Sequence, residues 1–432
     1  MLTHARIQYS AGQGCFHAAS VGVSGTIGLD KSGLIYVYDC GALSPFKSRL
    51  SDAIARFHRE IRHRNIDVLF ISHLHLDHVS GIEELCGPSG VGVDTVVLPL
   101  FDDFDRIISF ARAVSQDAAG ITDFIVGITI DPLATVAATL QPRRIVVVRR
   151  GEGGAPDRGE VDVAPEGPDE DGRGFRTVSW GWSGGGTLGA DGAPNSLPGS
   201  GTQVVSIDDT SGIEVQGRRR ADRWLLAPYV DQEVSDQRQE FLAELARRLF
   251  ITVSQLEELV ADPIGLTVLL DASRDELAAA YSAVKNLNVT SLSLLSVPSD
   301  SALTGRWRLL PTPPAWRFFS FTPADRRIGW LGTGDAALKQ AARRRRLLDH
   351  YAARLQQVST FLLPHHGSTH NFHEELLDRI EPRLCIAAAA PFSNWKHPGT
   401  SVIQAANSRG CPLWSVTGDR RSEIRENVWT RD

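Results

Sequence analysis

The sequence of 432 residues lacks any apolar run of the roughly 20 residues that a membrane-spanning helix needs. Its first 14 residues have no basic start followed by an apolar core, so we expect no signal peptide. Cysteine is scarce: the five residues are odd in number, lie far apart and form no C-x-x-C pair. This argues against a disulfide framework and for reduced thiols. We therefore expect a cytoplasmic protein with no membrane partner.

Charge of one sign is not in large excess either. The net charge of -6 gives no general attraction to nucleic acid, although a local basic patch could still exist. Hydrophobic residues make up 42% and charged residues 22%, which is typical of a globular protein. The basic run at 343–346 could be a nucleic-acid patch. At helical spacing its side chains spread around the helix, which favours a solvated surface.

Strand and helix patterns alternate in two regions, 1–100 and 286–432. The part between them, 101–285, differs, because it is rich in Gly, Pro, Asp and Ser at about 151–201. We expect that stretch to be a long, flexible loop. Amphipathic helical patterns resume at about 235–285, with one helix over 235–261. The sequence therefore predicts a domain in two segments with a large central insertion.

The main chemical signal is H-x-H-x-D-H at 73–78, directly after a predicted buried strand. Ligands often bind where a strand of an α/β sheet ends. In an extended H-x-H segment, His73 and His75 point the same way and can bind one metal. Asp77 and His78 follow at the turn and can reach a second one. Imidazole and carboxylate together suit Zn²⁺, Mn²⁺ or Fe. The alternative is a structural or solvated histidine cluster, which this density of ligands disfavours.

Further candidates also follow predicted strands. Asp335, in Gly-Thr-Gly-Asp, could bridge two cations; alternatively, it could cap a helix over 336–357. His365 and His366 are adjacent and follow a strand pattern. His397 lies before a proline, where a lone histidine is more often structural.

Together these segments resemble the metallo-β-lactamase superfamily. Within it, they resemble the hydrolase domain of the ComEC/Rec2 competence proteins and related phosphorylcholine esterases. Besides H-x-H-x-D-H, the matching blocks are 11–14, 38–41, 333–335, and 365–368 with 394–398. The matched regions cover about half of the chain. The resemblance implies an α/β (α+β) fold, namely a four-layer αββα sandwich built from 1–100 and 286–432, with 101–285 as an insertion.

The resemblance also implies roles for the candidate residues. One divalent cation would bind His73 and His75, and a second would bind Asp77, His78 and His366, with Asp335 bridging the two. Zn²⁺ is the first expectation, with Mn²⁺ and Fe as alternatives. The catalytic candidates are Asp77, which can orient the attacking water, and His365 and His397, which can stabilise negative charge or protonate the leaving group.

Two positions depart from the resemblance. Many superfamily members carry a further histidine before the bridging aspartate, but the corresponding segment, 286–291, contains none. Relatives often carry Asp after the G-Q-G block, where this chain has Cys15. The ligand set of the first metal is therefore open.

These observations predict a metal-dependent hydrolase, in the first place a dinuclear phosphodiesterase or nuclease acting on a phosphodiester or nucleic acid. A hydrolase of lactones, thioesters or β-lactams would use the same ligands. A non-catalytic metal-binding interaction protein is disfavoured, because the H-x-H-x-D-H cluster is complete. Phage defence and nucleotide signalling are both open as the biological setting.

Overall fold

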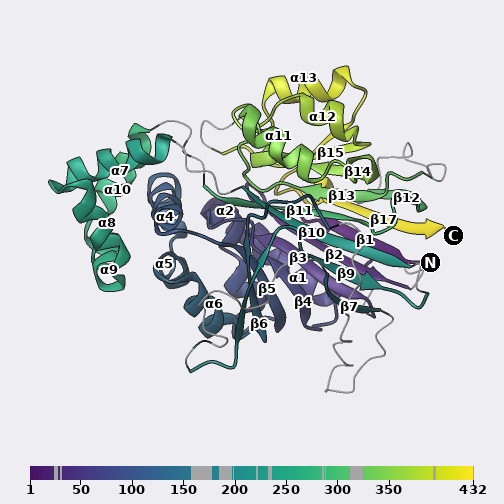
Figure 1. The fold of residues 1–432 in the computed structure, drawn as a ribbon, viewed down its shortest axis with the longest axis horizontal. Helices are drawn as coiled ribbons and strands as arrows, with labels where there is room; N and C mark the ends of the chain where they lie inside the picture. The colour runs from purple at the N-terminus through teal and green to yellow at the C-terminus, as the bar shows by residue number, and fades with distance from the viewer. Residues whose placement is uncertain are drawn as a thin grey trace.

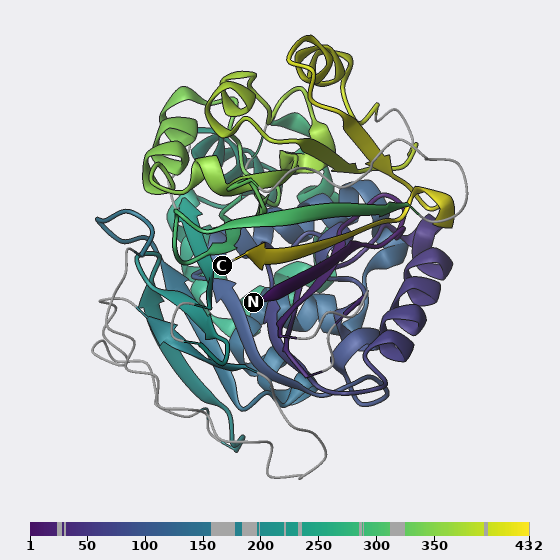
Figure 2. The same cartoon turned by 90° about the vertical axis from the view of Figure 1, so that its right-hand side faces the viewer.

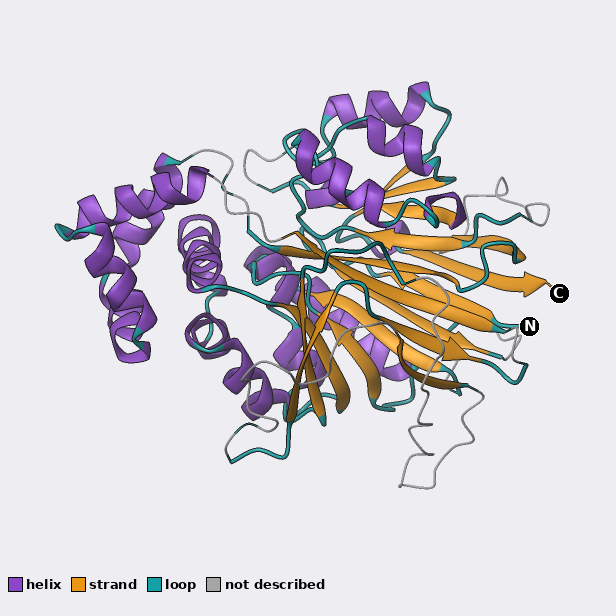
Figure 3. Cartoon of the chain, in the orientation of Figure 1, coloured by secondary structure: helices purple, strands orange, loops and turns teal. Residues whose placement is uncertain are grey.

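The computed structural model describes residues 1–23, 28–29, 32–156, 178–183, 197, 199–219, 222–231, 236–284, 287, 289–311, 325–392 and 396–431. Most of the Gly- and Pro-rich stretch at 151–201 lies outside these residues. The expectation that this stretch is flexible therefore falls outside the described residues as well. Two β-sheets face each other, and helices cover their outer sides (Figure 1, Figure 3). Among the described residues, no helix is both long and apolar enough to cross a membrane.

The first sheet, called sheet A, has nine strands and contains both ends of the chain. Strand β1 pairs antiparallel with β17, with Thr3 opposite Trp429, so the termini lie side by side (Figure 2). In spatial order the strands are β12 (Thr304–Pro311), β17 (Ile424–Arg431), β1 (Thr3–Gln8), β2 (Phe16–Gly22), β3 (Leu34–Cys40), β4 (Ile66–Phe70), β5 (Val93–Pro99), β6 (Arg144–Arg149) and β8 (Gln203–Asp208).

The second sheet, sheet B, has eight strands. Its strands β13 to β16 are parallel neighbours, whereas β11 pairs antiparallel with both β10 and β13. In spatial order they are β16 (Leu413–Val416), β15 (Leu384–Ala388), β14 (Val358–Leu362), β13 (Gly329–Gly332), β11 (Ser291–Pro298), β10 (Arg223–Asp231), β9 (Gly212–Gln216) and β7 (Ser179–Ser183).

Alternating side chains divide the core into layers. In β3, Ile35 and Val37 face the helices outside sheet A, while Tyr36 and Tyr38 face sheet B, as the two-residue period of a strand requires. The outer side of sheet A is covered by α1 (Lys47–Glu60), α3 (Ile82–Cys86), α5 (Asp123–Ile130) and α6 (Pro132–Leu140). The outer side of sheet B is covered by α11 (Ala341–His350), α12 (Glu375–Ile380) and α13 (Thr400–Ser408). The predicted four-layer αββα sandwich is thus confirmed.

A separate helical group stands at one end of the sandwich (Figure 1). Its apolar core joins α4 to four helices from the expected helical part of the insertion. These elements are α4 (Asp103–Asp117), α7 (Asp236–Leu249), α8 (Val253–Ala261), α9 (Pro263–Ala272) and α10 (Arg274–Ala283). The predicted single helix over 235–261 is wrong: Phe250 has a left-handed φ of 58°, and Thr252 caps a new helix with a side-chain hydrogen bond.

The region 101–285 also contributes to both sheets, although the sequence patterns predict only one strand in it, at 145–149. Strands β6 and β8 form one edge of sheet A, and β7, β9 and β10 form one edge of sheet B. The division of the chain into a domain of 1–100 and 286–432 and an insertion of 101–285 therefore stays a prediction.

Candidate metal centre

The candidate ligands lie where parallel strands end, as the strand patterns predicted. The H-x-H-x-D-H segment follows β4 and runs into the short helix α2 (Leu76–Val79). Asp335 follows β13, and His366 follows its parallel neighbour β14. Because sheet B faces sheet A, these three segments meet at one edge of the sandwich.

The first part of the H-x-H-x-D-H segment is extended, so its two histidines lie together. His73 Nε2 is 2.8 Å from His75 Nδ1. His73 Nε2 and His75 Nδ1 lie 3.4 and 3.2 Å from Asp335 Oδ2. The start of α2 then brings Asp77 and His78 into the same buried space, each 2% exposed.

Asp335 reaches the centre through a tight turn that requires glycine. Gly334 has a φ of 50°, and a Cβ there would lie 2.4 Å from Ser291 Oγ. The backbone N–H of Asp335 donates to that hydroxyl at 3.2 Å. The alternative that Asp335 caps a helix over 336–357 is wrong, because α11 begins only at Ala341, with Gln340 as its N-cap. The intervening Leu338 is instead buried beneath α11 as part of the outer core of sheet B.

His365 and His366 lie in a strained turn over Pro364–Gly367. Both have left-handed backbones, with φ of 47° and 57°, and Gly367 follows with φ of 79°. Such conformations cost about 1–3 kcal/mol each and are concentrated at functional sites. Here they direct the ring of His366 inward, where Nε2 lies 2.9 Å from Asp77 Oδ2.

Side chains and carbonyls behind the centre fix which ring nitrogen each histidine presents. His366 Nδ1 lies 2.7 Å from the carbonyl oxygen of Ala388. His73 Nδ1 lies 2.7 Å from Ser72 Oγ. In both rings Nε2 therefore faces the centre, as in proteins whose metal-binding histidines are held by an outer hydrogen bond.

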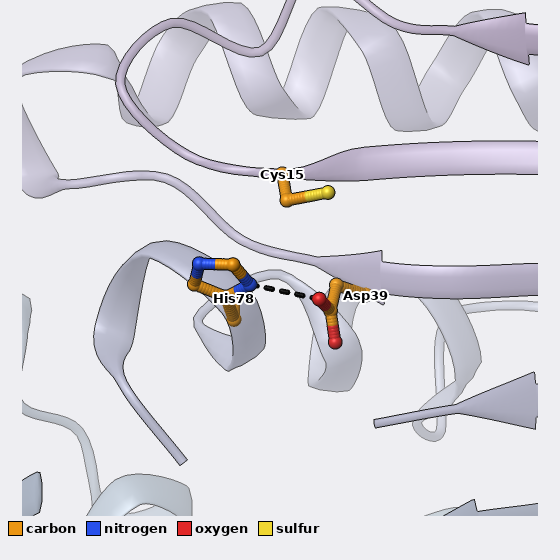
Figure 4. Close-up of side chains that lie close together, drawn as sticks. All are labelled: Cys15, Asp39 and His78. Atoms are coloured by element: carbon orange, nitrogen blue, oxygen red, sulfur yellow. Dashed lines mark hydrogen bonds and ion pairs between the residues drawn. The ribbon is translucent and has the colours of Figure 1, made fainter. Parts of the chain in front are cut away.

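Asp39 does the same for His78. Asp39 Oδ2 lies 2.8 Å from His78 Nδ1 (Figure 4). Cys15 lies close to this pair, but burial, and then the charge of Asp39, raise the pKa of its thiol well above the usual value. Asp39 thus holds the His78 ring from behind, with Cys15 beside the pair.

Two buried atoms at the centre fit a cation. His78 Nε2 and Asp335 Oδ1 face each other at 3.2 Å, and neither has a hydrogen-bond partner. Buried polar atoms are rarely left in this state unless an ion or water satisfies them. Two groups of close donors surround this position. The first is His73, His78 and Asp335, and the second is Asp77, His78 and His366. The residues present therefore fit a divalent metal.

The charge states of the carboxylates also suit metal binding. Burial alone would raise the pKa of Asp77, but the hydrogen bond from His366 lowers it well below its usual value. Burial opposes ionisation of Asp335 as well, but the histidines around it, His365 first, lower its pKa in the same way. Both carboxylates are thus ionised at neutral pH, as metal ligands must be.

One residue at the centre was missed from the sequence. Arg112 extends from α4 with its side chain 6% exposed, and its Nη1 lies 3.1 Å from Asp335 Oδ2. Its Nη2 lies 3.3 Å from His365 Nε2. The sequence pattern over 102–120 predicts only a helix, and no local pattern distinguishes Arg112 from a surface arginine.

The remaining candidates lie at the outer side of the centre. The His365 and His397 rings are 5.8 Å apart, and both residues line a cavity of about 660 Å³. The segment 286–291, where a further histidine was sought, is described only at Leu287 and from Val289 onward. All the predicted metal ligands lie together, whereas their individual roles stay predictions.

The arginine run at 343–346 is not the solvated surface that was expected. Arg343 and Arg344 are buried, at 5% and 7% exposure. Arg344 Nε lies 2.7 Å from Glu375 Oε2, and Arg346 pairs with Asp231 at 3.1 Å. These contacts tie α11 to α12 and β10, so the run has a structural role.

Comparison with known proteins gives a partial match to one family. The family described as Metallo-beta-lactamase superfamily matches residues 30–191, which include H-x-H-x-D-H. The chain is thus similar to this family over that segment. No curated protein is similar in sequence. A solved structure described as "Crystal structure of a long form RNase Z from yeast" is similar over 83% of this chain, at 6% identity and a TM-score of 0.28. The match covers 32% of that chain, so this protein spans about a third of its length.

Proposed function

We propose that this chain is a metal-dependent hydrolase that cleaves phosphodiesters, as a phosphodiesterase or nuclease. One arrangement supports the proposal most: buried histidine and aspartate donors beside a cavity whose charged lining is basic. The resemblance to the competence-protein branch of the superfamily points to the same substrate class.

The cavity lies beside the centre, next to α4 and α10. Its described lining residues include no Asp or Glu, whereas Arg112 and Lys396 carry positive charge and His365, His370 and His397 offer ring nitrogens. A phosphodiester carries a negative charge that such a lining attracts, whereas a lactam or lactone is neutral. The volume of about 660 Å³ lies within the range of small-molecule pockets.

Six residues would hold the divalent metal, with Zn²⁺ expected first: His73, His75, Asp77, His78, Asp335 and His366. A divalent metal in such a site lowers the pKa of a bound water and stabilises negative charge on a phosphoryl oxygen. The chain itself contributes donors on the cavity side. Arginine only donates hydrogen bonds, so His365 Nε2 accepts from Arg112.

His365 is suited to donate a hydrogen bond to the substrate. Burial lowers its pKa to about 3, although Asp335 opposes the shift. The ring is therefore neutral at pH 7, and with Nε2 accepting from Arg112 its proton lies on Nδ1. We assign this N–H to a phosphoryl or leaving-group oxygen, with His397 as a second group on the cavity wall.

A cytoplasmic location is also proposed. The five cysteines are all free and buried. Free thiols persist in a reducing compartment, which supports this location.

The purified, metal-loaded protein should hydrolyse bis(p-nitrophenyl) phosphate and turn over little nitrocefin. His365→Ala should keep its metal but lose roughly 10²–10⁴-fold in kcat, because a donor to developing charge is removed. The measurement compares the initial rate and the metal content of the wild type with those of His365→Ala.

His63→Ala is the matched control, because His63 is an exposed residue before β4. It should leave both rate and metal content unchanged. Faster hydrolysis of nitrocefin or a lactone by the wild type would contradict the phosphodiesterase proposal. Full activity of His365→Ala would show that His365 does not act as a donor in the reaction.

A further inference from the structure

The guanidinium of Arg112 lies among the residues expected to bind the first of two cations. It contacts both ring nitrogens of His75, with Nη1 3.4 Å from Nε2, and it pairs with Asp335 Oδ2 at 3.1 Å. Its Nε donates to Gln116 Oε1 at 2.9 Å, one turn further along α4. The arginine is therefore held in place by its own helix as well as by the centre.

This contact places a positive group where His75 would bind a metal. His75 Nδ1 points into the centre, 3.2 Å from Asp335 Oδ2, and Arg112 Nη1 lies against both atoms, 3.1 Å from that oxygen. A cation bound to His75 Nδ1 and Asp335 Oδ2 would lie beside the guanidinium, whose like charge repels it.

The donors away from the guanidinium surround one position. His73 Nε2, His75 Nδ1 and Asp335 Oδ2 lie within 3.4 Å of one another, but this set adjoins Arg112. Among the described residues, the other two groups of close donors at the centre both contain His78. His78 Nδ1 already contacts Asp39, so only Nε2 is left for a metal. Both groups thus meet at the same nitrogen.

We propose that the centre binds one divalent cation, at His78 Nε2, and that the guanidinium of Arg112 takes the place of a second cation. The proposal rests on the metal-dependent function proposed above, and it differs from the two-cation centre expected from the sequence. A fixed guanidinium supplies positive charge and planar N–H donors that match the oxygens of a phosphate. Arg112 also lines the cavity, so the same group could contact the phosphodiester directly.

Metal stoichiometry tests this inference without any assay of activity. Wild type, Arg112→Met and Arg112→Lys would be stripped with a chelator, equilibrated with Zn²⁺ and analysed by inductively coupled plasma mass spectrometry. We expect one Zn²⁺ per chain in the wild type. Arg112→Met should bind two, because the repelling charge beside His75 Nδ1 and Asp335 Oδ2 is gone. Arg112→Lys, which keeps the charge, should stay at one.

Two metals in the wild type, or one in a folded Arg112→Met, would overturn the proposal. Electron paramagnetic resonance of the Mn²⁺-loaded wild type gives a second readout that needs no substitution. An uncoupled Mn²⁺ spectrum supports a single ion, whereas an exchange-coupled spectrum shows two neighbouring ions and overturns the proposal. Failure of all three proteins to bind metal would instead contradict the proposed hydrolase function.

Discussion

Asp335→Ala should abolish metal binding and reduce phosphodiester hydrolysis by at least about 10⁴-fold. One oxygen of Asp335 faces His78 Nε2 at 3.2 Å and the other faces His75 Nδ1 at the same distance. Its loss removes the carboxylate that joins the two sides of the centre. Metal activation of the nucleophile and stabilisation of the transition state would both be lost, and effects of this kind are worth roughly 10²–10⁴-fold each.

The matched control is Asp378→Ala, which removes a half-exposed carboxylate from α12. It should keep the metal and the rate of the wild type. Circular dichroism would show that Asp335→Ala is folded, since the change also leaves Arg112 without its carboxylate at the centre. Unchanged metal content together with a rate within tenfold of the wild type would exclude Asp335 as a ligand.

Trp330→Ala should lower the free energy of unfolding by about 3–5 kcal/mol, the usual cost of removing a large buried aromatic ring. Trp330 is fully buried between the two sheets. It stacks on His17 with ring centroids 4.1 Å apart and meets Tyr38 edge-on at 5.5 Å. A Cβ on Gly332 would lie 2.2 Å from the Trp330 ring, so the Trp330 side chain requires glycine at position 332, just before the Asp335 turn.

Urea unfolding followed by circular dichroism measures this effect. Phe250→Ala is the control, because Phe250 is 95% exposed and its loss should change stability by no more than about 0.5 kcal/mol. A loss of less than about 1 kcal/mol in Trp330→Ala would mean that the two sheets do not depend on this contact.

The parts of the centre that depend on local geometry could be predicted from the sequence. The pleat of an extended segment places His73 and His75 on one side, and a following turn brings in Asp77 and His78. Asp335 and His366 could also be predicted, because each follows a strand and the ends of parallel strands meet at one edge. The turn before Asp335, with its left-handed φ at Gly334, was not predicted from the sequence.

Other features depend on packing that no local pattern encodes. Arg112 lies 223 residues from Asp335 in the chain and reaches it only because α4 packs beside the centre. Its helix has an ordinary amphipathic pattern, so the arginine is indistinguishable from a solvated one. Strands β7 to β10 were missed for a similar reason. They lie within or after the Gly- and Pro-rich stretch, and β8 and β10 are defined by their pairing with β6 and β11.

Removal and return of the metal tests the central claim most directly. Wild-type protein stripped of metal with a chelator should lose its hydrolysis of bis(p-nitrophenyl) phosphate. Addition of Zn²⁺ or Mn²⁺ should restore the rate in proportion to the metal bound, because the buried carboxylates and imidazoles described above hold the ion that activates water. Hydrolysis at an unchanged rate by the metal-free protein, or no hydrolysis by the metal-loaded protein, would contradict the account.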